Sequence, residues 1–242
     1  MRGLLVALIL ILSGCRATVT TQVDVGADGH GTVRAGVGLD DEALQKVGDV
    51  AAELRVDDLR QAGWTVEGPR KADDGLTWVR ASWAFDDAEQ ANRALAQLSG
   101  PEGPFRDLEL VRTSSLLRST TRLAGTVDLS RGLGGFADAD LAARVGDTLP
   151  LDVARLRAEL GPEADRVLQV RFEASLPGSP ETNAPTRSGG RAVWAPALGQ
   201  QLRIDASSDH LRLVPLVPAV VAAVLLLAVL CGLLIVRRRR RI

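Results

Sequence analysis

The chain has 242 residues, and this length allows one domain or two small ones. Hydrophobic residues make up 46% of it and charged residues 24%. Six of its 29 basic residues lie near the two ends, so the part between keeps 23 basic residues against 30 acidic ones. A surface that binds nucleic acid needs clustered positive charge, which an acidic middle does not supply. Two His and two Cys residues also exclude most disulfide frameworks and metal centres. We therefore expect no nucleic acid, no metal and no cofactor.

The first 15 residues have the pattern of a bacterial lipoprotein signal. A basic start is followed by an apolar run over residues 3–12, which is too short to span a bilayer. The sequence Leu-Ser-Gly-Cys at 12–15 resembles the lipobox. The resemblance implies that residues 1–14 are a signal peptide and that Cys15 carries a diacylglycerol, with its freed amine as a second acylation point, for example for palmitate. The alternative is a cleaved signal or a short anchor with an incidental Cys.

The last 30 residues predict a membrane anchor. Leu213–Val236 is a stretch of 24 residues without a charged side chain, and a helix of that length covers the hydrocarbon core. Five arginines follow at once and favour a cytoplasmic end; they are Arg237, Arg238, Arg239, Arg240 and Arg241. We therefore expect a transmembrane helix over 213–236, a basic cytoplasmic tail over 237–242, and an extracytoplasmic domain over 15–212 held at the cell membrane.

Hydrophobic periodicity predicts the elements of the domain over 15–212. Strands are expected over residues 19–25, 32–39, 64–67, 76–85, 105–112, 121–129, 168–176, 192–194 and 201–206. Helices are expected to begin at the acidic residues 40–42 and 86–87, and residues 138–160 are either helical or irregular. This order predicts an α+β fold, a mostly antiparallel sheet with helices packed on one face, plus one C-terminal transmembrane helix.

The strand expected over 76–85 carries the candidate ligand-binding residues. Its alternation puts Trp83 on the face expected to be buried, and Trp78 and Arg80 together on the opposite face. An aromatic ring beside a guanidinium offers apolar contact and a donor for phosphate or sugar. Trp78 and Arg80 are therefore the candidate pair. The alternative is a sheet face that a helix or the second half of the chain covers.

Signatures of catalysis are missing from the sequence. It contains no G-x-S-x-G, H-E-x-x-H, Walker A or C-x-x-C motif. Aspartate pairs at 40–41 and 86–87 are expected to cap helices, and His30 and His210 have no signature of a base or a ligand. We therefore expect no enzyme and no catalytic residue, although a buried carboxylate pair in a cleft would revive the idea of a hydrolase.

Several short motifs resemble the LppM-type lipoproteins of actinobacteria. They are the lipobox at Cys15, the strand-turn at 28–32, Ala-Gly-Thr-Val-Asp-Leu at 124–129, and Phe-Glu-Ala-Ser-Leu-Pro-Gly at 172–178 followed by 182–183 and 193–194. The order of lipobox, ectodomain, single helix and basic tail is similar too. The resemblance implies a cell-envelope lipoprotein whose ectodomain engages envelope lipids or glycolipids. The alternative is a non-catalytic domain that docks onto another envelope protein.

Overall fold

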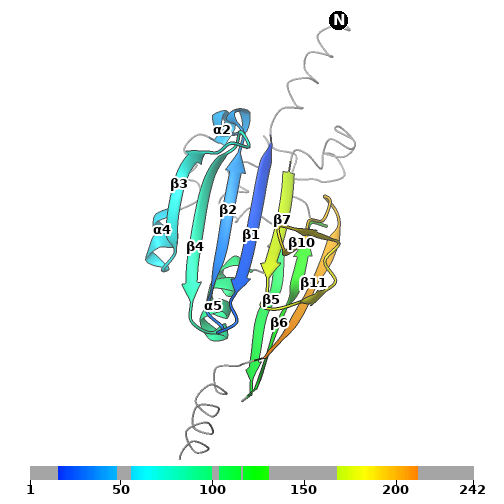
Figure 1. Ribbon diagram of the computed structural model, residues 1–242. Helices are drawn as coiled ribbons and strands as arrows, with labels where there is room; N and C mark the ends of the chain where they lie inside the picture. Colours follow the sequence, from blue (N-terminus) through cyan, green and yellow to red (C-terminus); the bar gives the residue numbers. More distant parts are fainter. Residues whose placement is uncertain (1–15, 48–55, 100–103, 116, 131–167, 212–242) are drawn as a thin grey trace, which may run out of the picture.

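Two β-sheets are formed by the part of the chain that the computed structural model describes, residues 16–47, 56–99, 104–115, 117–130 and 168–211 (Figure 1). The strands of the larger sheet are β1 (Ala17–Val25), β2 (Gly31–Leu39), β3 (Thr65–Lys71), β4 (Thr77–Phe85), β7 (Leu168–Ser175), β9 (Thr186–Ser188) and β10 (Arg191–Trp194). Those of the smaller sheet are β5 (Phe105–Ser114), β6 (Arg118–Asp128), β8 (Glu181–Thr182) and β11 (Gln201–Leu211). The described helices are α2 (Asp41–Val47), α4 (Val56–Gln61) and α5 (Ala88–Leu98).

The larger sheet joins two distant parts of the chain. Its spatial order is β3-β4-β2-β1-β7-β10-β9, and that of the smaller sheet is β5-β6-β11-β8. β1 pairs antiparallel with β2 across a tight turn and parallel with β7, so Thr21 lies between Ala35 and Phe172. The sheet is therefore mixed, because β7 returns in the direction of β1 after a long connection.

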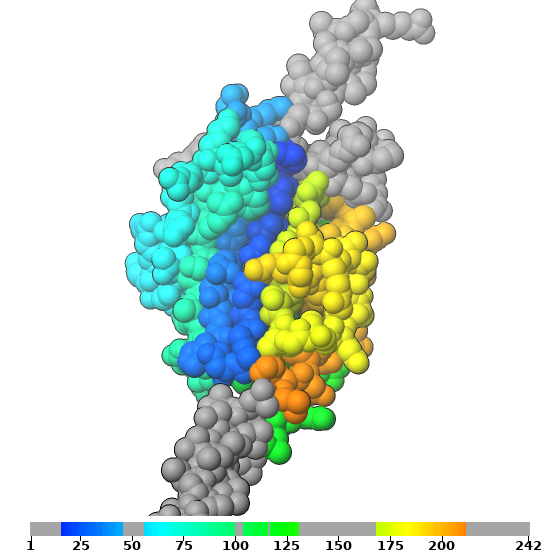
Figure 2. Space-filling model, viewed as in Figure 1, coloured from blue at the N-terminus to red at the C-terminus, as the bar shows by residue number. Residues whose placement is uncertain are grey.

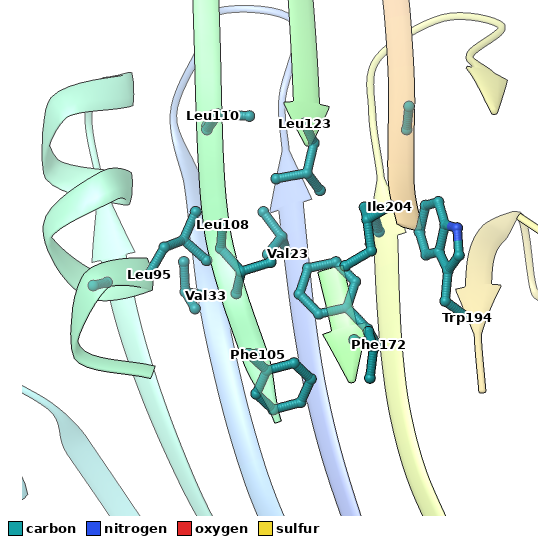
Figure 3. Close-up of a cluster of buried hydrophobic side chains, with 14 of the residues drawn as sticks. Val23, Val33, Leu95, Phe105, Leu108, Leu110, Leu123, Phe172, Trp194 and Ile204 are labelled. Atoms are coloured by element: carbon teal, nitrogen blue, oxygen red, sulfur yellow. The ribbon is translucent and has the colours of Figure 1, made fainter. Parts of the chain in front are cut away.

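α5 extends the layer of the smaller sheet. Its N-cap Asp87 accepts a hydrogen bond from the Gln90 N–H, which satisfies one of the free donors of the first turn. Ala91, Ala94 and Leu95 form its buried side. In Figure 3 the labelled Leu95 lies near Val33 and Leu108, so α5 covers the same face of the larger sheet that β5 covers.

The core lies between the two sheets. Figure 3 shows Phe105, Leu123 and Phe172 gathered between strands of both layers, and Phe172 and Leu123 are fully buried. The Phe172 ring centroid is 6.0 Å from the ring centroids of both Phe105 and Trp194. Aromatic and branched side chains thus fill the space that the described residues enclose between the sheets.

The predicted fold class is wrong. A sheet with helices packed on one face was expected, but β5, β6, β8 and β11 form a second sheet in the place assigned to helices. Alternation along a strand specifies which face is buried, but it does not specify whether a helix or another sheet covers that face. The predicted C-terminal transmembrane helix is not seen either, because no helix among the described residues is long and apolar enough to cross a membrane. The predicted span, 213–236, lies outside the described residues.

The other terminal predictions also concern residues outside the described ranges. They are the signal peptide over 1–14, Cys15, and the basic tail with Arg237, Arg238, Arg239, Arg240 and Arg241. The segment 138–160, predicted as helical or irregular, lies outside them as well.

Candidate functional site

The outer face of the larger sheet carries the predicted ligand-binding pair. This face points away from the smaller sheet and toward the viewer in Figures 1 and 2, where β1 and β2 are blue and β3 and β4 cyan. Strand register puts Trp78 between Gly38 of β2 and Arg70 of β3, and Arg80 between Gly36 and Glu67. The structure therefore brings Trp78 and Arg80 together on the face where alternation predicted them.

Two glycines make room for the Trp78 ring. A methyl group at Gly38 would lie 2.7 Å from the indole, and one at Gly36 would lie 3.4 Å from it. The indole therefore lies close against the β2 backbone, and Trp78 is only 6% exposed. Trp78 is accordingly a firmly seated side chain on this face rather than an open stacking platform.

The indole nitrogen of Trp78 is held by Asp74, in the turn before β4. Its Nε1 donates to Asp74 Oδ2 at 3.0 Å, and the Leu76 backbone N–H donates to Asp74 Oδ1, also at 3.0 Å. The Leu76 N–H is the main cause that lowers the pKa of Asp74 below its ordinary value of 3.8. Desolvation opposes this shift, while the Trp78 N–H and the charges of Arg16 and Arg80 add to it. Asp74 is thus kept ionised as the support of the indole.

Arg80 is the side chain of the pair that is free to bind. Its guanidinium lies over the Trp78 ring, with Cζ 4.6 Å from the ring centroid, a cation–π contact. Arg80 is exposed, and within the described part of the chain its N–H groups have neither a hydrogen bond nor an ion pair. Arg70, opposite Trp78, is equally exposed and unpaired among these residues. The two guanidinium groups can therefore donate to an anion such as a phosphate.

Arg16 connects this site to the start of the domain. Its Nη2 donates to the Asp74 carbonyl at 3.0 Å, and its backbone N–H donates to Asp40 Oδ2. Because β1 begins at Ala17, the chain has no linker between residue 15 and this cluster. We call Arg16, Arg70, Asp74, Trp78 and Arg80 the Trp78 cluster.

Sequence analysis missed three members of the Trp78 cluster. Asp74 lies between the strands expected over 64–67 and 76–85 and was given no role, and neither were Arg16 and Arg70. A usable signal was present in β2, where Gly36 and Gly38 alternate with apolar residues, because glycines on one face of a strand often mark a closely approaching group. Which group approaches is decided by pairing with β4, which local sequence does not reveal.

No catalytic arrangement of side chains is found among the residues that the structure describes. His30 lies with Nδ1 3.1 Å from Asp28 Oδ2 and Nε2 3.6 Å from Asp86 Oδ1, and all three side chains are well exposed. No group of three potential metal ligands occurs among the residues that the structure describes. His30 and its two carboxylates therefore form a solvated surface cluster.

Comparison with known proteins identifies no family for the chain. No family model matches it, and no curated protein matches its sequence. Among solved structures, the NMR structure of the folded domain of Mycobacterium tuberculosis LppM is similar, with a TM-score of 0.40 and 12% sequence identity. The match covers 81% of this chain and 91% of that one. A likeness at this level defines neither a family nor a ligand.

Proposed function

We propose that the protein is a non-catalytic lipoprotein of the bacterial cell envelope whose Trp78 cluster binds the anionic headgroups of membrane lipids or glycolipids. The observation that carries the proposal is the pair of free guanidinium groups, Arg70 and Arg80, beside the seated Trp78 indole. The ligand is the headgroup rather than the acyl chain, since the space between the sheets is filled by buried side chains of the described residues.

Attachment through Cys15 would place the site at its ligand. A diacylglycerol on Cys15 has two acyl chains, which is enough for stable attachment to a bilayer. Arg16 follows Cys15 directly and is bonded to Asp74. The Trp78 cluster would then lie at the level of the headgroups. Basic side chains near an anionic membrane surface contribute about 1 kcal/mol each.

The alternative is a domain that docks onto another envelope protein through the same face. Arg34 and Arg191 both pair with Asp24 on this face, farther from Arg16 than Arg80 is. Such a pre-formed network of charges suits a polar protein interface as well as a headgroup layer. The alternative predicts no preference among lipids.

Lipid preference tests the proposal. The full chain is placed in nanodiscs of phosphatidylcholine and phosphatidylglycerol in equal parts, and native mass spectrometry identifies the lipids that stay bound. We expect preferential retention of phosphatidylglycerol and a several-fold loss in the Arg70→Gln/Arg80→Gln double variant. The matched control is Arg122→Gln, an exposed arginine paired with Asp205 on the smaller sheet, which should keep the wild-type preference. Equal retention of both lipids by the wild type would reject the headgroup site and favour protein docking.

Lipidation is tested separately by the intact mass of the mature chain. We expect loss of residues 1–14 and a mass increase of a diacylglycerol on Cys15, both abolished by Cys15→Ser. A mature chain that begins elsewhere, or that lacks the added mass, would reject lipid attachment at Cys15.

A further inference from the structure

Exposed apolar side chains gather on the smaller sheet. The large hydrophobic side chains most exposed among the described residues are Val111, Leu117 and Leu211, at 46%, 50% and 61%. Leu117 immediately precedes β6, and Leu211 closes β11 directly opposite Arg118. Two leucines therefore flank one arginine at the same end of this sheet. We call Leu117, Arg118 and Leu211 the apolar tip.

The apolar tip lies at the opposite end of the domain from the Trp78 cluster. Arg112, near the end of β5, donates to the Ala27 carbonyl at 2.8 Å, so this end of the smaller sheet adjoins the β1–β2 turn. Arg16 precedes the other end of β1. Nine residues of extended strand separate the two ends by roughly 25–30 Å. In Figure 1, β1 begins near the top of the molecule and β11 ends near the bottom.

We propose that the apolar tip is a second contact with lipid, in which Leu117 and Leu211 enter the interfacial layer of a bilayer. The chain continues from Leu211 into 31 further residues, of which the 24 at 213–236 carry no charge. A segment that is so apolar leaves water for an apolar phase, and it holds the residues that precede it in the chain beside that phase. Leu211 lies two residues before this segment, and Leu117 directly precedes Arg118, the residue with which Leu211 pairs.

The charge of the apolar tip suits the same surface. The Arg118 side chain is 65% exposed and forms a long, exposed ion pair with Asp209, whose Oδ2 is 3.8 Å from Arg118 Nη1. An arginine at this position can lay its aliphatic stem along Leu211, its neighbour on β11, and direct its guanidinium to lipid phosphates. The inference does not require the lipid on Cys15 or the headgroup site of the Trp78 cluster. If all three hold, both ends of β1 lie near the bilayer, with the strands along its surface.

The experiment places a fluorescent probe at single cysteines in the full chain. Cys231→Ser removes the second thiol, and a chain without an added cysteine reports any labelling of Cys15. The probe is attached at Leu117→Cys in the apolar tip, at Asp73→Cys beside the Trp78 cluster, and at Ser188→Cys on the exposed strand β9. The protein is reconstituted into vesicles of phosphatidylcholine and phosphatidylglycerol in equal parts. Quenching by brominated lipid is compared with quenching by aqueous iodide.

At position 117 we expect quenching by brominated lipid at least several-fold stronger than at position 188, with correspondingly weaker quenching by iodide. Strong iodide quenching at 117, equal to that at 188, would overturn the inference. Protection from both quenchers would overturn it as well, because the leucines would then be covered by protein, either segment 213–236 or a second copy of the chain. The probe at position 73 reports on the headgroup site alone. A negative result at position 117 therefore rejects the apolar tip as a lipid contact without rejecting the proposed function.

Discussion

The indole of Trp78 lies against Gly38 of the neighbouring strand, at a distance where a methyl group on Gly38 would come within 2.7 Å of the ring. The missing side chain at Gly38 of β2 thus makes room for the Trp78 indole of β4, and this space is its seat. Arg80 lies over the same ring, so the position of its guanidinium depends on that seat. One of the two free guanidinium groups of this face, that of Arg80, therefore depends for its position on a glycine of another strand.

Gly38→Ala is expected to destabilise the domain by about 1–3 kcal/mol, because the added methyl displaces a nearly buried indole. Urea unfolding of the full chain in detergent measures the change. Gly36→Ala is the matched control and should cost less, since its methyl would lie 3.1 Å from its closest atom, Thr20 Oγ1, and 3.4 Å from the ring. A gain of about 0.5–1 kcal/mol at Gly38, the usual effect of replacing a strand glycine by alanine, would contradict the seat.

Asp74 predicts a pH dependence of stability. Its pKa is lowered below 3.8 in the folded chain, chiefly by the Leu76 N–H, so its ionised form stabilises the fold. This stabilisation is complete above the ordinary pKa and is lost as the pH falls through the lower folded-state pKa. The difference in Tm between wild type and Asp74→Asn should therefore be constant near neutral pH and shrink below about pH 4. The control Asp73→Asn makes the same charge change beside it, and an identical pH profile for both variants would argue against a special role of Asp74.

Asn92 is expected to stabilise the edge strand β5 and to slow hydrogen exchange at its Leu110 amide. Its Nδ2 donates to the Leu110 carbonyl at 2.9 Å, and its Oδ1 accepts from the Leu110 N–H at 2.7 Å. Asn92→Ala leaves both groups without this partner and should cost about 1–3 kcal/mol. Hydrogen exchange should accelerate at the Leu110 amide in Asn92→Ala and much less in Asn92→Asp, which keeps the acceptor. Arg93→Ala, on the exposed side of α5, is the control, and an equal effect of both alanine variants would refute the assignment.

The burial of Phe172 predicts how much the free energy of unfolding falls when a large side chain is removed from the core. It is fully buried between Phe105 and Trp194, so Phe172→Ala should destabilise the domain by about 3–5 kcal/mol. Leu211→Ala removes an exposed side chain and should change stability by no more than about 0.5 kcal/mol. Chemical denaturation of both variants makes the comparison. Similar losses in the two would mean that the sheets do not pack through Phe172.

Much of the strand pattern could be predicted because alternation is local. The strands expected over 32–39, 76–85 and 168–176 occur within one residue of the predicted bounds. The strand expected over 201–206 instead runs to Leu211. The predicted strand is too short because the last buried residue of β11, Ser208, is polar. Local pattern therefore fails where a buried position is not apolar.

Helix caps and side-chain faces were predicted with mixed success. Asp40 and Asp87 accept backbone hydrogen bonds at the starts of α2 and α5, which confirms the capping hypothesis. Trp83, expected in the core, is only partly buried at its margin and meets Trp64 edge-on, with ring centroids 5.6 Å apart. Alternation gives the direction of Trp83, but the extent of the covering layer decides how deeply it is buried.

The division into two sheets could not be predicted, because it depends on pairings between distant residues. Nothing in β1 alone indicates that Thr21 pairs with Phe172 as well as with Ala35. The Trp78 cluster has the same origin. Its face follows from the sequence of β4, whereas the glycine seat, Asp74 and Arg16 come from three other segments.

The parallel pairing of β1 with β7 also has a consequence for how the chain folds. β1 pairs with β7, which follows some 150 residues later in the chain. The larger sheet therefore has a high contact order, and slow folding is expected. Until β7 has been synthesised, the β7-facing side of β1 is an open edge able to pair with other chains. A nascent chain stopped before Leu168 would therefore be prone to aggregate, and a chaperone that shields strand edges would protect it until synthesis is complete.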